Sequence, residues 1–130
     1  MKYFFILFLF ALCSCKTEEK EFLLKKGDIL FQDLDSSPLC DAIELVTKGY
    51  DNRNFSHIGI VVKTGDLKKI KDSNYNYNND VRILEAIPDK VVTTKLDSFI
   101  NRSVDKNNNP KVIVGRLKPE YSNLIDDAII

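Results

Sequence analysis

The segment from Ser56 to Lys63 constrains the fold of this chain more than any other stretch of the sequence. It is rich in isoleucine and valine, whose β-branched side chains favour a strand. Side chains alternate between the two faces of a strand. One face would carry Ile58, Ile60 and Val62, and the other would carry His57, Gly59 and Val61. We therefore predict a strand with its isoleucine face on the core, while the glycine leaves open space beside the imidazole.

Turn residues and apolar spacing predict further elements on both sides of this strand. Other strands are expected at residues 29–31, 81–87, 90–93 and 111–117. A helix should begin after Ser37, its N-cap, and carry an apolar stripe of Leu39, Ala42, Ile43 and Val46. Shorter helices are expected at 95–100 and from Pro119 onward, and the polar segment 66–80 should be an exposed excursion. This interleaving predicts an α+β fold around an open sheet.

The first 15 residues have the layout of an export signal. Lys2 precedes an apolar run from Tyr3 to Leu12, which is too short to span a membrane. The residues up to Cys15 resemble the lipobox of bacterial lipoproteins, in which the final cysteine carries lipid. We expect a signal peptide at 1–14, a polar tether at 15–24, and a protein anchored through Cys15 to the cell envelope, at the outer membrane. The alternative is a plain cleaved signal in which Cys15 is incidental.

Charge and cysteine content exclude several classes of protein. Basic and acidic residues number 19 each, so no basic patch for nucleic acid is indicated. Of three cysteines only Cys40 lies outside the leader, which excludes a disulfide framework. One cysteine and one histidine in different elements make a poor zinc site. We expect neither a metal nor a cofactor, and a single small domain over residues 25–130.

His57 is the only histidine, and Glu85 is its best potential partner in the sequence. Histidine titrates near neutral pH, which suits a general base. Glu85 lies in a strand that looks apolar on both faces, where a carboxylate is costly unless it is paired. A carboxylate on one ring nitrogen would fix the tautomer and leave the other nitrogen free to accept a proton. The alternatives are a structural histidine at a sheet edge and a glutamate facing water.

Cys40 is the one candidate thiol nucleophile in this part of the sequence. As the third residue of the predicted helix it would have a lowered pKa, which the neighbouring Asp41 would oppose. The alternative is an inert, buried cysteine that packs beside the apolar stripe.

The order of these segments resembles the NlpC/P60 superfamily of papain-like cysteine hydrolases, in its circularly permuted, YiiX/YebB-like branch. The similar stretches are residues 27–32, 42–47, 55–61, 83–86, 91–100 and 114–117. The resemblance implies a papain-like fold, with His57 as catalytic base and Glu85 as the residue that orients it. In the permuted order the nucleophilic cysteine follows these strands, and no such segment occurs before Ile130. We therefore expect a chain truncated before the nucleophile helix, with Cys40 as an alternative nucleophile or as a helix residue that lines the site.

Two functions of different class follow from this resemblance. The first is a hydrolase of amide or related acyl bonds, which would act on a peptidoglycan peptide or a lipid acyl group. The second is a non-catalytic binding module of the envelope, or a truncated inactive product, which would keep the cleft without the nucleophile. The sequence leaves the oligomeric state open.

Overall fold

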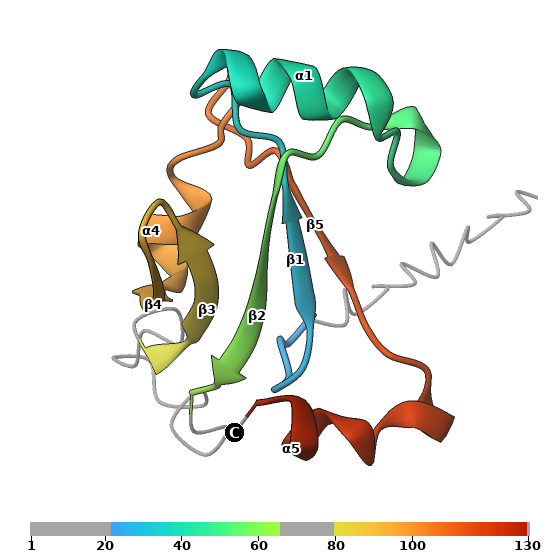
Figure 1. Cartoon of the computed structure of the whole chain (residues 1–130). Helices are drawn as coiled ribbons and strands as arrows, with labels where there is room; N and C mark the ends of the chain where they lie inside the picture. The colour runs from blue at the N-terminus through green and yellow to red at the C-terminus, as the bar shows by residue number, and fades with distance from the viewer. Residues whose placement is uncertain (1–21, 66–79, 130) are drawn as a thin grey trace, which may run out of the picture.

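The computed structural model describes residues 22–65 and 80–129, which form an α+β fold around one antiparallel sheet. The five strands lie in the order β4-β3-β2-β1-β5 (Figure 1). Their bounds are Ile29–Gln32 for β1, His57–Lys63 for β2, Arg82–Ile87 for β3, Lys90–Lys95 for β4 and Val112–Gly115 for β5. The predicted α+β class is confirmed. The leader with Cys15 and most of the predicted excursion at 66–80 lie outside the described residues.

Helices lie at both ends of the sheet and beside its β3–β4 edge. Helix α1 (Pro38–Val46) lies across one end and α5 (Leu124–Ala128) at the other, while α4 (Leu96–Ile100) lies beside β3 and β4 (Figure 1). Two 3₁₀ turns, η1 (Tyr50–Asn52) and η2 (Pro119–Tyr121), complete the described elements. Pro119 therefore opens a short turn, and the helix predicted from this residue begins only at Leu124.

The start of α1 follows from its capping residues. Ser37 has an extended backbone and its hydroxyl accepts a hydrogen bond from the Cys40 amide, as predicted for the N-cap. Pro38 occupies the first turn, where a missing amide hydrogen costs nothing. The predicted apolar stripe is wrong, however, because Leu39 and Val46 are exposed and the buried residues of α1 are Cys40 and Glu44. The helix is therefore rotated so that a thiol and a carboxylate face inward.

The core lies on the face of the sheet that α4 covers. Its members are Leu30, Val61, Val81, Ile83, Leu96 and Phe99. Glycine at position 59 makes room for this packing, because a Cβ there would lie 2.8 Å from Cε2 of Phe99 and would also meet Ile83. The predicted core face of β2 is thus wrong, since Gly59 and Val61 are buried and Ile58 is 54% exposed. The space predicted beside the imidazole is filled by Phe99 and Ile83.

The opposite face of the sheet is apolar and only partly covered. Ile58 and Val91 are its most exposed large side chains, and Phe31, Ile60 and Leu84 are half-buried. At one end of this face Ile125 of α5 closes over Gly27, which has a left-handed φ of 87°. Within residues 22–65 and 80–129, no helix has the length and apolar character needed to cross a membrane.

Candidate functional site

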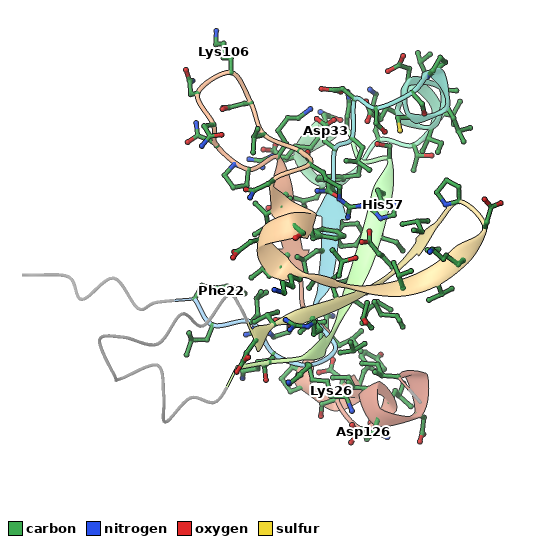
Figure 2. All side chains as sticks on the ribbon, turned by 90° about the vertical axis from the view of Figure 1, so that its left-hand side faces the viewer. Phe22, Lys26, Asp33, His57, Lys106 and Asp126 are labelled. Carbon is green, nitrogen blue, oxygen red and sulfur yellow. The ribbon has the colours of Figure 1, made fainter. Side chains whose placement is uncertain are left out.

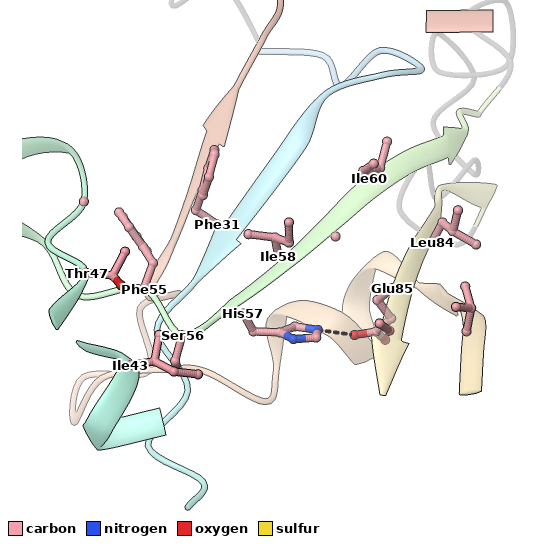
Figure 3. A pocket seen from close by; sticks show the side chains of 14 residues that line it. Phe31, Ile43, Thr47, Phe55, Ser56, His57, Ile58, Ile60, Leu84 and Glu85 are labelled. Atoms are coloured by element: carbon pink, nitrogen blue, oxygen red, sulfur yellow. Dashed lines mark hydrogen bonds and ion pairs between the residues drawn. The ribbon is translucent and has the colours of Figure 1, made fainter. Parts of the chain in front are cut away.

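His57 and Glu85 are in direct contact on the core side of the sheet. Nε2 of His57 lies 2.7 Å from Oε2 of Glu85 (Figure 3). The predicted contact between these two side chains is therefore present. The imidazole is largely buried and its ring centroid lies 5.9 Å from that of Phe99, at an angle of 33°.

Strand pairing brings the two residues together. Glu85 pairs with Gly59, so its side chain points to the same face as that of His57, two residues earlier in β2. The pairing of β2 with β3 ends at this position, and β3 curves away from the start of β2 (Figure 1). The imidazole extends across this divergence to the carboxylate of Glu85.

Glu85 is buried and held by three donors. It is 3% exposed, and its carboxylate accepts hydrogen bonds from Thr94 Oγ1, from Nη2 of Arg102 at 2.6 Å, and from His57. Burial by itself would raise the pKa of this carboxyl, but the hydrogen bonds from Thr94, Arg102 and His57 outweigh it and lower the pKa. Glu85 is therefore ionised at neutral pH, and the alternative of a glutamate facing water does not apply.

The ionised carboxylate determines the tautomer of the histidine. Because it can only accept hydrogen bonds, Nε2 of His57 carries the hydrogen and donates it to Glu85. In the neutral imidazole Nδ1 then has a free lone pair. This is the arrangement that lets an imidazole accept a proton from a third group.

A cavity of about 550 Å³ opens beside this pair, between β2, β3 and the C-terminal half of α1 (Figure 3). We call it the His57 cavity. It is lined by Phe31, Ile43, Thr47, Gly49, Phe55, Ser56, His57, Ile58, Gly59, Ile60, Leu84, Glu85, Ala86 and Val91. The lining is predominantly apolar, and the side chains of Ile58, Ile60, Leu84 and Val91 lie on the opposite face of the sheet from those of His57 and Glu85. The His57 side chain is 18% exposed and that of Glu85 is 1% exposed, so the imidazole is the accessible member of the pair. An apolar cavity with a few polar groups is typical of a binding site for a small molecule or a peptide.

Cys40 lies near this cavity but is not among its lining residues. Its thiol is within hydrogen-bond distance of the hydroxyls of Ser36 (3.4 Å) and Ser37 (3.5 Å). These hydrogen bonds lower the pKa of Cys40 from 9.0 to about 7, against the opposing effect of burial. No hydrogen bond from the thiol to His57 or Glu85 is present among the described residues. The prediction that Cys40 lines the site is therefore not met in this cavity. Cys40 is buried, as the packing alternative predicted, but its thiol contacts serine hydroxyls.

Two polar residues of the site were missed by the sequence predictions. Thr94 lies on β4 two strand positions from Val92, the cross-strand partner of Glu85, so strand alternation could have placed it on the same face. Arg102 follows α4, and its guanidinium lies over the ring of Phe99, 5.1 Å from the centroid, as well as against Glu85. The sequence offers no periodic signal for Arg102, because it lies in a turn.

Comparisons of the whole chain with models of protein families, with curated proteins and with solved structures give no significant match.

Proposed function

We propose that this chain carries the general base of a cysteine hydrolase of amide or acyl bonds, with a permuted NlpC/P60-like papain fold. In this proposal His57 is the catalytic base and Glu85 orients it. Thr94 and Arg102 are positioning residues, because they hold the carboxylate that holds the imidazole. The observation that carries the proposal is the 2.7 Å contact between Nε2 of His57 and the buried, ionised Glu85, at the edge of an apolar cavity.

The proposed reaction has two steps. Nδ1 of His57 accepts the proton of a cysteine thiol, and the thiolate attacks the carbonyl carbon of the substrate. The imidazolium then returns the proton to the departing amine or alcohol, which leaves an acyl-enzyme. In the second step His57 accepts a proton from water, the hydroxide displaces the thiolate, and the acid product leaves.

The proposed reaction requires a nucleophilic thiol. The resemblance places it after the strands described here, and Cys40 is the alternative. The lowered pKa of Cys40 suits a nucleophile, and its neighbour Ser56 lines the His57 cavity directly before the histidine. Activity through Cys40 would require a substrate or a movement that bridges the thiol and the imidazole.

Hydrolysis by protein purified from its native cells tests the proposal. Peptidoglycan stem peptides and a long-chain acyl amide are offered to the wild type and to His57→Ala, Glu85→Gln, Cys40→Ser and Asp126→Asn variants. Loss of release in the first two, with full activity in Asp126→Asn, is the expected result. Asp126 is a suitable control because it is exposed and lies at the opposite end of the molecule from His57 (Figure 2). Unchanged hydrolysis in His57→Ala would refute the proposed base.

The second candidate function is a non-catalytic binding module. It is favoured by the His57 cavity itself, which has no thiol among its described lining residues. This function predicts that the same stem peptides or acyl chains bind without being cleaved, and that a bulky Ile58→Trp variant weakens binding. Turnover by the wild type would exclude it.

A further inference from the structure

Three carboxylates, two from the segment after β1 and one from α1 itself, meet beside this helix. Asp33 and Asp35 follow β1, Glu44 lies on α1, and one oxygen from each lies within 4.8 Å of the others. Figure 2 shows Asp33 at the same end of the molecule as His57. We call these three residues the Glu44 cluster. None of them lines the His57 cavity.

Glu44 is the member of this cluster with a buried carboxylate oxygen that has no hydrogen-bond partner within residues 22–65 and 80–129. The residue is 7% exposed, and no donor among the described residues lies within hydrogen-bond distance of its buried Oε1. A buried carboxylate without a hydrogen-bond partner or a counter-charge is strongly destabilising. Its position against two further carboxylates makes the charge still more costly, so this arrangement calls for a positive charge.

Lys111 supplies only part of that charge. Its Nζ lies 3.0 Å from Oδ1 of Asp33 and 2.5 Å from Oδ2 of Asp35. The ammonium therefore pairs with the two aspartates and offsets one of three negative charges. It makes no hydrogen bond with the unpaired Oε1 of Glu44.

We propose that Asp33, Asp35 and Glu44 bind a calcium ion. Calcium is a hard cation that prefers carboxylate oxygens at 2.3–2.6 Å, so two oxygens on opposite sides of one ion lie about 5 Å apart. The oxygens of the Glu44 cluster fall within that span without rearrangement. Magnesium, with oxygens at 2.0–2.1 Å, needs a tighter and more regular set. Water fills the remaining coordination positions, and Asp35, which is 70% exposed at its side chain, provides the route from solvent.

The bound ion joins α1 to the end of β1. The buried residues of α1 are only Cys40 and Glu44, so the helix has little apolar attachment to the sheet. An ion held between Glu44 and the two aspartates fixes the helix that carries Ser37 and Cys40. The site is independent of the proposed hydrolase reaction, because it shares no residue with the His57–Glu85 pair. The sequence analysis predicted no metal because one cysteine and one histidine make a poor zinc site. It did not consider these carboxylates, which come together only in the folded chain.

Calcium binding to the full chain tests this inference. The protein is freed of metal with chelator, and CaCl₂ is titrated by calorimetry and in thermal unfolding. We expect one site per chain with a dissociation constant on the order of 10⁻⁴–10⁻³ M, as in extracellular calcium modules. At about ten times that concentration the Tm should rise by roughly 5–10 °C. The absence of heat and of any Tm shift in about 10 mM CaCl₂ would overturn the proposal.

Variants of the cluster separate binding from folding. Glu44→Gln should raise the Tm in the absence of calcium, because it removes a buried charge, and should abolish the calcium-dependent rise. Asp35 is exposed, so Asp35→Asn should weaken calcium binding at least tenfold without loss of the fold. Asp41→Asn, an exposed change on the same helix, should bind as the wild type does. Lys111→Met should bind more tightly, since a competing cation is removed. Equal binding by Glu44→Gln and the wild type would contradict the assignment.

Discussion

Arg116 binds both carboxylate oxygens of the buried Asp28. Its Nε donates to Oδ1 and its Nη2 to Oδ2, each at 2.7 Å, and the Lys25 amide also donates to Oδ2 at 2.7 Å. Asp28 is 1% exposed. This paired interaction joins the turn before β1 to the residue that follows β5.

Replacement of Asp28 by Ala should lower the free energy of unfolding by about 3 kcal/mol. The loss arises because the partly exposed guanidinium of Arg116 and the Lys25 amide lose their acceptor, and the buried site of Asp28 loses its carboxylate. Urea denaturation measures the change. Asp126→Ala is the matched control, because its ion pair with Lys26 is exposed and should contribute at most about 1 kcal/mol. Similar losses in the two variants would contradict this view of Asp28.

Gly59→Ala should destabilise the protein by about 1–3 kcal/mol through overpacking. Its Cβ would lie 2.8 Å from Cε2 of Phe99 and would also clash with Ile83. Phe99→Leu removes part of the ring, so the double variant should be less destabilised than the sum of the two single changes. Chemical denaturation of the four proteins measures this coupling, and strictly additive losses would show that Phe99 does not fill the space at Gly59.

The stability of the protein should fall in acid because of Glu85. Its pKa is lowered from 4.5 in the folded state, so its stabilising contribution is complete above pH 4.5 and is lost as the pH falls through the lower, folded value. Glu85→Gln cannot titrate and should show a weaker decrease across this range. Unfolding curves from pH 7 to pH 3 compare the two proteins. Parallel pH profiles would mean that Glu85 is not the responsible group.

Cys40 should be alkylated with a pH midpoint near 7 instead of 9.0. The Ser36 hydroxyl is the largest contribution to this lowered pKa, so Ser36→Ala should shift the midpoint upward. The rate of iodoacetamide labelling against pH, followed by mass spectrometry of the peptide that contains Cys40, provides the measurement. Ser122→Ala, at a distant exposed serine, should leave the midpoint unchanged. A wild-type midpoint near 9.0 would contradict the prediction.

Cys15 should carry lipid in the native cell. Labelled palmitate should be incorporated into the wild-type protein and lost in Cys15→Ser, because the thiol is the attachment point of the proposed anchor. Cys13→Ser should keep the label, because the residue before Cys13 is the bulky Leu12, whereas cleavage before a lipid-carrying cysteine needs a small residue. Gel fluorography after metabolic labelling reads out all three proteins. Incorporation of the label into Cys15→Ser would show that Cys15 is not the lipid attachment site.

Local signals in the sequence determined most of the elements. Ser37 and Pro38 begin α1 as predicted, because capping depends on a few adjacent residues. The strand predicted at Ser56–Lys63 is β2, and the turn at Asp89, with its φ of 74°, separates β3 from β4. Glu85 was also correctly expected to need a partner, since a carboxylate in an apolar strand is costly wherever the strand lies.

Only the tertiary structure decided which face of β2 is buried. Ile58, Ile60 and Val62 make one face of this strand the more apolar, so alternation favoured the face that is in fact the less buried one. The choice depends on α4, because Phe99 fits where Gly59 has no side chain. The same is true of Arg102 at Glu85 and of the carboxylates that meet at Glu44, because their positions depend on how separate elements pack against one another. Contacts of this kind depend on the packing of the whole sheet, and no local pattern in the sequence encodes them.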